Sequence, residues 1–233
     1  MIRLFFYLFF LFLCVPAISQ PLAGTTGLLN IPSANMQEDG TFMAGANYLP
    51  ISLTPPEWDY NTGNYYLNIT FLPFLEISYR MTLFKLAGSN HFNNQDRSLS
   101  ARFRIVKEKE YIPSVVIGSN DMYSSSQGFT VDRFFTSFYL TATKNLSYNN
   151  HKFGATAGYV YELSKSNYVS GVFGGISYSP SFLPYLQLMA EYDSRVFNGG
   201  ASLLLFNHIY LFGMAHDLKQ LTGGFAFLVY LNK

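Results

Sequence analysis

Five charged residues fall on the polar faces of segments whose residues alternate in the manner of β-strands. They are Glu76, Arg80, Arg102, Arg104 and Glu191. If those faces line a closed interior, the three arginines form a cationic row that the two glutamates counter. Such a row could have either of two roles. It could form a network of salt bridges that fills the interior, or an electrostatic surface that contacts an anionic polymer or glycolipid. The sequence leaves both roles open.

Three aromatic residues in predicted outer loops could contact a glycan. They are Trp58, Tyr60 and Tyr123. Sugar rings stack on exposed aromatic faces, which are large and apolar but carry a polar edge. The alternative role for the same residues is anchoring at a membrane–water interface, where Trp and Tyr gather.

The histidines offer little support for an enzyme. All four lie in or beside predicted loops, at 91, 151, 208 and 216. A barrel enzyme acting on lipid or glycolipid needs a Ser or His held by an orienting partner. Ser89 with His91, and His216 with Asp217, supply suitable groups, but neighbours in sequence do not make a triad. The chain has no nucleotide loop and no metal-ligand spacing, so we expect no cofactor, no metal and no enzymatic activity.

Alternation with a period of two residues runs through most of the chain. In residues 75–83, for example, Leu75, Ile77 and Tyr79 oppose Glu76 and Ser78. This pattern is typical of strands with one apolar and one polar face. It predicts strands at 41–53, 60–71, 75–85, 97–106, 112–120, 133–144, 152–163, 168–178, 184–192, 199–206, 209–215 and 221–231. We therefore expect an all-β antiparallel barrel of about twelve strands, and strand counts from roughly ten to fourteen stay open as alternatives.

Composition indicates which face points outward. The chain is 18% aromatic, with 18 Tyr and 23 Phe, and only 12% charged, about half the charge of a typical soluble protein. Outer-membrane barrels turn their apolar faces to lipid and their polar faces to the interior. We therefore predict a transmembrane barrel with outer-membrane lipid as its surroundings. The nearly neutral net charge of +1 gives no sign of a nucleic-acid partner.

The first residues read as a secretory signal peptide. Arg3 precedes an apolar run from Leu4 to Val15, and a small-x-small site ends at Ser19. A lipoprotein signal at Cys14 is the alternative, but large residues stand before that cysteine. We therefore expect residues 1–19 to be removed on export to the bacterial outer membrane. The Phe-rich signal and Gln20 would suit a Bacteroidetes-type bacterium.

The connections between predicted strands sort alternately into two classes. The mostly tight ones are 72–74, 107–110, 145–150, 179–183 and 207–208, and the longer or more polar ones are 54–59, 86–96, 121–132, 164–167, 193–198 and 216–220. Short periplasmic turns and longer outer loops are the pattern of outer-membrane barrels. Residues 20–40 lack alternation, so we expect an irregular segment that plugs or caps a barrel spanning 41–233.

Several stretches are similar to the YjbH family of bacterial outer-membrane proteins linked to exopolysaccharide production. They are Gly27–Ala34 with Asp39–Thr41, Asp96–Ser98, Tyr111–Gly118 with Asn120–Asp121, and Ala190–Asp193. Their order along the chain also resembles the family. The resemblance implies an outer-membrane barrel that helps to make, export or attach a surface polysaccharide. It supplies no catalytic residues. Longer family members continue past the end of this chain, which implies a reduced module or a subunit.

Together these observations predict a non-enzymatic accessory, a scaffold or conduit in the production or export of surface polysaccharide. Its expected partners are outer-membrane lipid, polysaccharide and other proteins of an exopolysaccharide system. Two alternatives stay open: an outer-membrane enzyme that modifies lipid or glycolipid, and a small diffusion pore.

Overall fold

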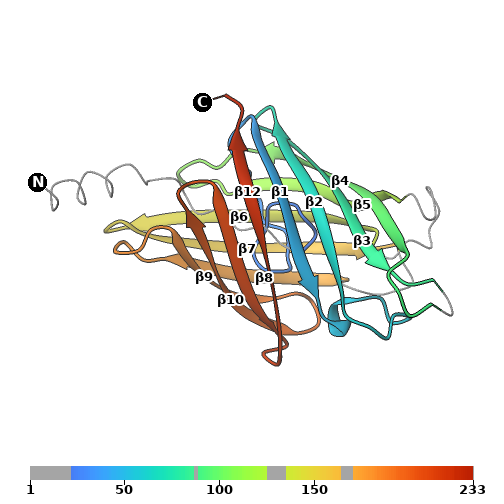
Figure 1. The fold of residues 1–233 in the computed structure, drawn as a ribbon. Coiled ribbons are helices and arrows are strands. Elements are labelled where there is room, and N and C mark those ends of the chain that lie inside the picture. Colours follow the sequence, from blue (N-terminus) through green and yellow to red (C-terminus); the bar gives the residue numbers. More distant parts are fainter. Residues whose placement is uncertain (1–21, 87–88, 125–134, 164–169, 233) are drawn as a thin grey trace, which may run out of the picture.

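The protein is a closed β-barrel of twelve antiparallel strands (Figure 1). The computed structural model describes residues 22–86, 89–124, 135–163 and 170–232. The predicted signal peptide, residues 1–19, lies outside them. The strands are β1(Thr41–Leu49), β2(Thr62–Phe71), β3(Leu75–Phe84), β4(Asn94–Val106), β5(Ser114–Ser124), β6(Ser137–Tyr148), β7(His151–Glu162), β8(Gly171–Ser179), β9(Leu186–Tyr192), β10(Phe197–Leu205), β11(Ile209–His216) and β12(Gln220–Tyr230).

Each strand pairs with its neighbours in sequence, and β1 pairs with β12 to close the ring. At this seam Thr41 lies opposite Tyr230, and Tyr48 lies opposite Gly223. The prediction of an antiparallel barrel of about twelve strands is therefore confirmed. Closure leaves no free sheet edge, which would otherwise be open to pairing with other chains.

Strand ends differ from the prediction in a few places. The first predicted strand continued to residue 53, but β1 stops at Leu49 because Pro50 follows, and a short 3₁₀ helix, η1(Ile51–Leu53), takes its place. At the other extreme, β5 runs on to Ser124, four residues past its predicted end. The first residues of the predicted loop 121–132 therefore belong to this strand.

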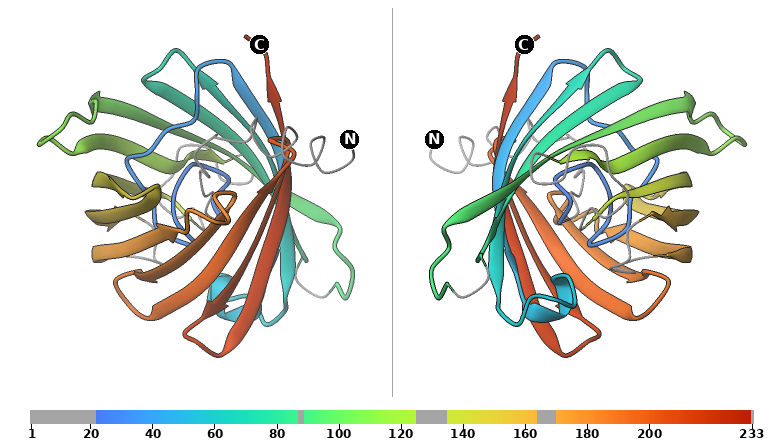
Figure 2. Two further views of the ribbon diagram at one scale, coloured as in Figure 1. Left: turned by 90° about the vertical axis from the view of Figure 1, so that its left-hand side faces the viewer. Right: turned by 90° about the vertical axis from the view of Figure 1, so that its right-hand side faces the viewer.

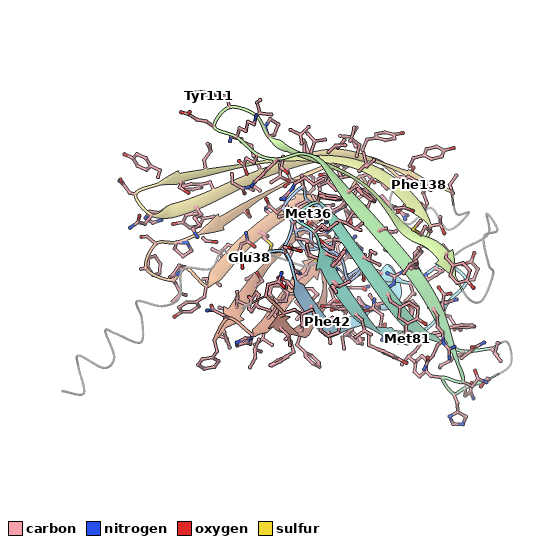
Figure 3. All side chains as sticks on the ribbon, turned by 90° about the horizontal axis from the view of Figure 1, so that it is seen from above. Met36, Glu38, Phe42, Met81, Tyr111 and Phe138 are labelled. Atoms are coloured by element: carbon pink, nitrogen blue, oxygen red, sulfur yellow. The ribbon has the colours of Figure 1, made fainter. Side chains whose placement is uncertain are left out.

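Apolar side chains cover the outside of the barrel and polar ones line the inside. On the outer face Leu67 is 42%, Phe103 45% and Leu188 44% exposed, whereas on the inner face Thr70 and Thr82 are fully buried. Figure 3 shows Phe138 pointing away from the barrel wall. The arrangement is the reverse of a water-soluble barrel, whose apolar side chains point inward. Among the described residues, no helix is both long and apolar enough to cross a bilayer, a test that does not address strands.

The strand connections form two rims. We call the turn rim the end that carries 72–74, 107–113, 149–150, 180–185 and 206–208, together with the start of β1 and the end of β12. We call the loop rim the end that carries 50–61, 85–93, 193–196 and 217–219, and the connections β5–β6 and β7–β8, which lie partly outside the described residues. Asn149 and Asn150, both at positive φ, make the two-residue turn at the tip of β6 and β7. The turn rim is the compact end.

The segment of residues 22–40, which we call the inner segment, lies inside the barrel (Figure 2). Its buried apolar side chains Leu22, Leu28, Leu29 and Ile31 form one hydrophobic cluster with inward-facing wall residues such as Phe173. The wall makes room for them with glycines. A Cβ on Gly175 would lie 2.7 Å from Leu28 Cδ1, and one on Gly200 would lie 2.9 Å from Leu29 Cδ2. The hydrophobic core of this protein is therefore the contact between the inner segment and the wall.

Candidate functional site

Glu191 on β9 holds a tight turn of the inner segment. Its carboxylate accepts hydrogen bonds from the backbone N–H groups of Leu29, Asn30 and Ile31, at 2.9, 2.7 and 3.4 Å. Asn198 Nδ2 donates to the same carboxylate at 3.1 Å. Three successive amides aimed at one anion form a concave site of the kind that backbone turns make for anions. Here the bound anion is the Glu191 carboxylate of the barrel wall, so Glu191 holds this turn of the inner segment in place.

Asp193 extends this attachment toward the loop rim. It accepts hydrogen bonds from Asn30 Nδ2 at 3.1 Å and from Asn198 Nδ2 at 3.0 Å. Asn198 Oδ1 in turn lies 3.0 Å from His216 Nδ1. Two of the stretches that resemble the YjbH family, Gly27–Ala34 and Ala190–Asp193, thus bind each other.

Arg102 on β4 holds the opposite side of the inner segment. Its side chain is completely buried, and its guanidinium donates to the carbonyl oxygens of Thr26, Ser33 and Asn35, the last at 2.8 Å. Arg102 Nε lies 3.7 Å from Glu76 Oε2. The planar guanidinium suits this role because it offers five donors in fixed directions.

Glu76 on β3 completes this second attachment. It accepts hydrogen bonds from Thr26 N at 2.6 Å, Thr26 Oγ1 at 2.7 Å and Asn68 Nδ2 at 2.9 Å. The carboxylate therefore serves both its ion-pair partner and the inner segment. Because both charges are removed from water, each depends on these bonds to offset the loss of hydration.

The other two predicted arginines have separate partners. Arg80 pairs with Asp121 on β5, and its guanidinium carbon lies 4.6 Å from the ring centre of Phe135. Arg104, half-buried at the turn rim, donates to the Pro73 carbonyl oxygen. The prediction of one cationic row countered by two glutamates is wrong in this respect. Arg80 is countered by Asp121, which sequence reasoning had assigned to a loop.

Of the three predicted aromatic contacts, Trp58 and Tyr60 lie together and Tyr123 lies on another strand. Trp58 is only 6% exposed and stacks on Tyr60 and Phe84, with ring centres 5.6 and 5.8 Å apart. The Tyr60 hydroxyl accepts a hydrogen bond from Lys85 N at 2.9 Å, and burial raises the pKa of this phenol. Tyr123 is 40% exposed but lies in strand β5, so its assignment to a loop is wrong.

The structure places none of the serine–histidine groups that the sequence suggested into a triad. Within the described part of the chain, Ser89 Oγ bonds the backbone of His91, and the His216 ring bonds Asn198. One such contact that the sequence did not suggest occurs at the turn rim. Ser181 Oγ lies 3.2 Å from His151 Nε2, and the Tyr178 hydroxyl lies 2.8 Å from His151 Nδ1.

An ion pair ties the turn 107–113 to β6 on the same rim. Glu108 accepts hydrogen bonds from Lys144 Nζ at 3.0 Å and from Asn145 N and Nδ2, both at 2.7 Å. Partial burial opposes ionisation of Glu108, but the bonds from Asn145 and Lys144 outweigh it and lower the pKa of the carboxyl. Asn145 Nδ2 also reaches Asn35 of the inner segment at 2.9 Å.

The model of the YjbH family, described as "Exopolysaccharide biosynthesis protein YbjH", matches residues 19–200. No curated protein matches the chain. Among solved structures, a mutant of the Rh. blastica porin is similar, with 8% identity over 83% of this chain and 75% of that chain, and a TM-score of 0.33. The family match spans most of the sequence, including both attachments of the inner segment, and this chain belongs to the YjbH family.

Proposed function

We propose that the protein is an outer-membrane barrel that acts as a non-enzymatic accessory, a scaffold rather than an open conduit, in the production of an exopolysaccharide. The observation that carries this proposal is an apolar-outside barrel, in a chain of an exopolysaccharide family, whose interior is occupied by its own inner segment. Buried side chains from both halves of the barrel hold that segment. An interior filled in this way favours contact with the polymer at a rim over passage through the lumen.

The outer surface supports the membrane setting. Large apolar residues cover the middle of the strands, whereas the long connections gather at one rim. With short turns facing the periplasm, as is usual for such barrels, the turn rim faces the periplasm and the loop rim faces outward. Tyr111, which Figure 3 shows projecting from the turn 107–113, then stands at the periplasmic interface.

Replacing Phe225 with arginine tests this setting. Phe225 is the central residue of β12 and is 58% exposed on the outer face. A charge at the middle of a lipid-facing strand costs about 2–4 kcal/mol, so we expect F225R to lower the stability of the barrel in lipid vesicles by that amount, measured by urea unfolding. L218R, in the turn before the same strand, is the matched control and should change little. Equal stability of F225R and wild type in vesicles would contradict a lipid-facing wall.

The contact between Ser181 and His151 favours an enzyme as the second candidate function. We rank it lower because Ser181 N also lies 3.4 Å from His151 Nδ1, so the serine and the ring brace two adjacent turns. A hydrolase would need the imidazole free to take the serine proton and a partner that stabilises the resulting charge. The partner here is a tyrosine hydroxyl rather than a carboxylate, which makes it a weak one for that purpose.

Deletion of the gene, followed by staining of the surface glycan, tests the proposed function. We expect the deletion to reduce or alter surface glycan, and both wild type and S181A to restore it fully. Unchanged glycan after deletion would remove the accessory role. Restoration by wild type but not by S181A, with equal amounts of both proteins in the membrane, would instead establish the enzyme.

A further inference from the structure

A pocket opens at the turn rim beside the inner segment. Its volume is about 270 Å³, and it lies between residues 35–36 and the rim ends of strands β6 to β9. Its polar lining residues are Asn35, Asn145, Ser147, Lys152, Ser177, Ser179 and Gln187, and Met36, Leu146 and Phe153 add apolar surface. Glu191 and Arg102 do not line the pocket, but Arg102 fixes part of its wall by donating to the Asn35 carbonyl oxygen.

Strand register explains how these residues meet. Ser147 pairs with Lys152, and Lys152 pairs with Ser179, so their side chains follow one row around the inner face. Asn145 and Ser177 belong to the adjacent inward row, on either side of Gly154. Gly154 leaves room for the Ser177 hydroxyl, since a Cβ at this glycine would lie 2.5 Å from Ser177 Oγ. The pocket is thus built by rigid strands rather than by flexible loops.

The chemistry of the lining is specific. The polar part of the lining consists of hydroxyl and amide groups with Lys152 as the one charged residue among the lining residues, and no carboxylate is present in the lining. Gln187 is only 8% exposed, and its Oε1 has no hydrogen-bond partner among the described residues. A buried amide oxygen without a partner has lost its hydration and gained no bond in return. A ligand hydroxyl would supply the missing donor.

Lys152 is also available for a ligand. No ion pair to Lys152 occurs within the described part of the chain, whereas its neighbour Lys144 is paired with Glu108. The Glu108 carboxylate contacts Asn145 from outside the lining and is already neutralised by Lys144. An ammonium group that faces hydroxyls and amides, with no acid beside it, attracts an anion.

We propose that this pocket binds an anionic saccharide. A carboxylate or other acidic group on the sugar would meet Lys152, and sugar hydroxyls would meet the serines, Asn145 and Gln187. A simple inorganic anion would use the lysine but leave most of the neutral groups without partners. The volume approaches the lower end of pockets that hold small organic ligands, which suits one or two sugar rings. The inference rests on the proposed function, since it names the class of polymer that the turn rim would contact.

Binding to the purified full-length protein in detergent tests the site, with trigalacturonic acid as the anionic probe and maltotriose as the neutral one, by titration calorimetry. We expect wild type to bind trigalacturonic acid in the millimolar range or tighter and to prefer it to maltotriose. K152A should weaken binding of the acid about tenfold, the loss of one charge-assisted contact. K107A, an exposed lysine in a turn of the same rim, is the matched control and should bind as wild type does.

A second variant probes the shape of the pocket. Ser147 is exposed at the pocket edge, so S147W should fill the space and weaken both probes without disturbing the fold, which thermal unfolding checks. Three results would overturn the proposal: no binding of trigalacturonic acid by wild type, equal weakening by K152A and K107A, or equally tight binding of inorganic phosphate. These results concern the purified protein, so they are independent of whether gene deletion changes surface glycan.

Discussion

Replacing Arg102 with alanine is expected to lower the free energy of unfolding of the barrel by about 3–5 kcal/mol, the usual effect of removing one partner of a buried ion pair. The guanidinium donates to three carbonyl oxygens of the inner segment and lies beside the fully buried Glu76. Without it, the Glu76 charge stays buried with only its hydrogen bonds to offset desolvation. The midpoint of urea unfolding in detergent or lipid vesicles measures the loss.

Arg104 provides a matched control on the same strand and the same face. It is half-buried and donates to one carbonyl oxygen, that of Pro73. We expect R104A to cost no more than about 1 kcal/mol, as for a single partly exposed hydrogen bond. A similar loss for R102A and R104A would mean that the buried attachment does not dominate, and no loss for R102A would contradict the arrangement of the inner segment described above.

Removing residues 22–38 is expected to turn a barrel that does not conduct into one that does. The inner segment occupies the lumen, and a barrel of this size without it would enclose more space than its wall side chains fill. Planar bilayer recordings should show no ion conductance for wild type and stepwise conductance for the deletion variant. Four large aliphatic side chains of the segment, each worth about 2 kcal/mol when buried, are lost as well. The variant should therefore also unfold at lower urea.

A point variant tests the same block of the lumen if the deletion variant does not assemble. E191A keeps the whole chain but removes the acceptor for three backbone amides and Asn198. We expect a loss of about 3 kcal/mol and intermittent conductance as the turn around Asn30 detaches. Conductance in the wild type equal to that of the deletion variant would show that the inner segment does not block the lumen, and would favour the diffusion pore.

The strands were predictable because apolar and polar residues alternate along each one, which matches the outside and the interior of the barrel. Leu75, Ile77 and Tyr79 face out while Glu76 and Ser78 face in, and a period of two has no other common explanation. Strand ends were harder. Asp121 looked like a loop residue, yet it lies inside β5 with φ of 47° and forms an ion pair with the buried Arg80, two strands away. Only the position of its partner distinguishes a buried aspartate from one in a turn.

The candidate site was predictable in part. The polar faces pointed to Glu76, Arg102 and Glu191 as residues of the interior, and all three are buried there. What they bind was not visible, because their main partners are backbone groups of the inner segment, which any residue type provides. Arg102 and Arg104 were likewise indistinguishable, since they share a face and differ only in their distance from the rim. The rim pocket gave no signal, because serines and asparagines spaced over four strands form no motif.

The attachment of Leu29 to Glu191 joins residues 162 positions apart, and this has a consequence for biogenesis. Glu191 is synthesised long after Leu29, so these contacts cannot form until the intervening strands have been made. Pairings so distant along the chain form slowly. The seam between β1 and β12 forms later still, because β12 follows β9 in the chain. The wall thus closes around a segment of the same polypeptide, and closing the barrel is coupled to filling its interior.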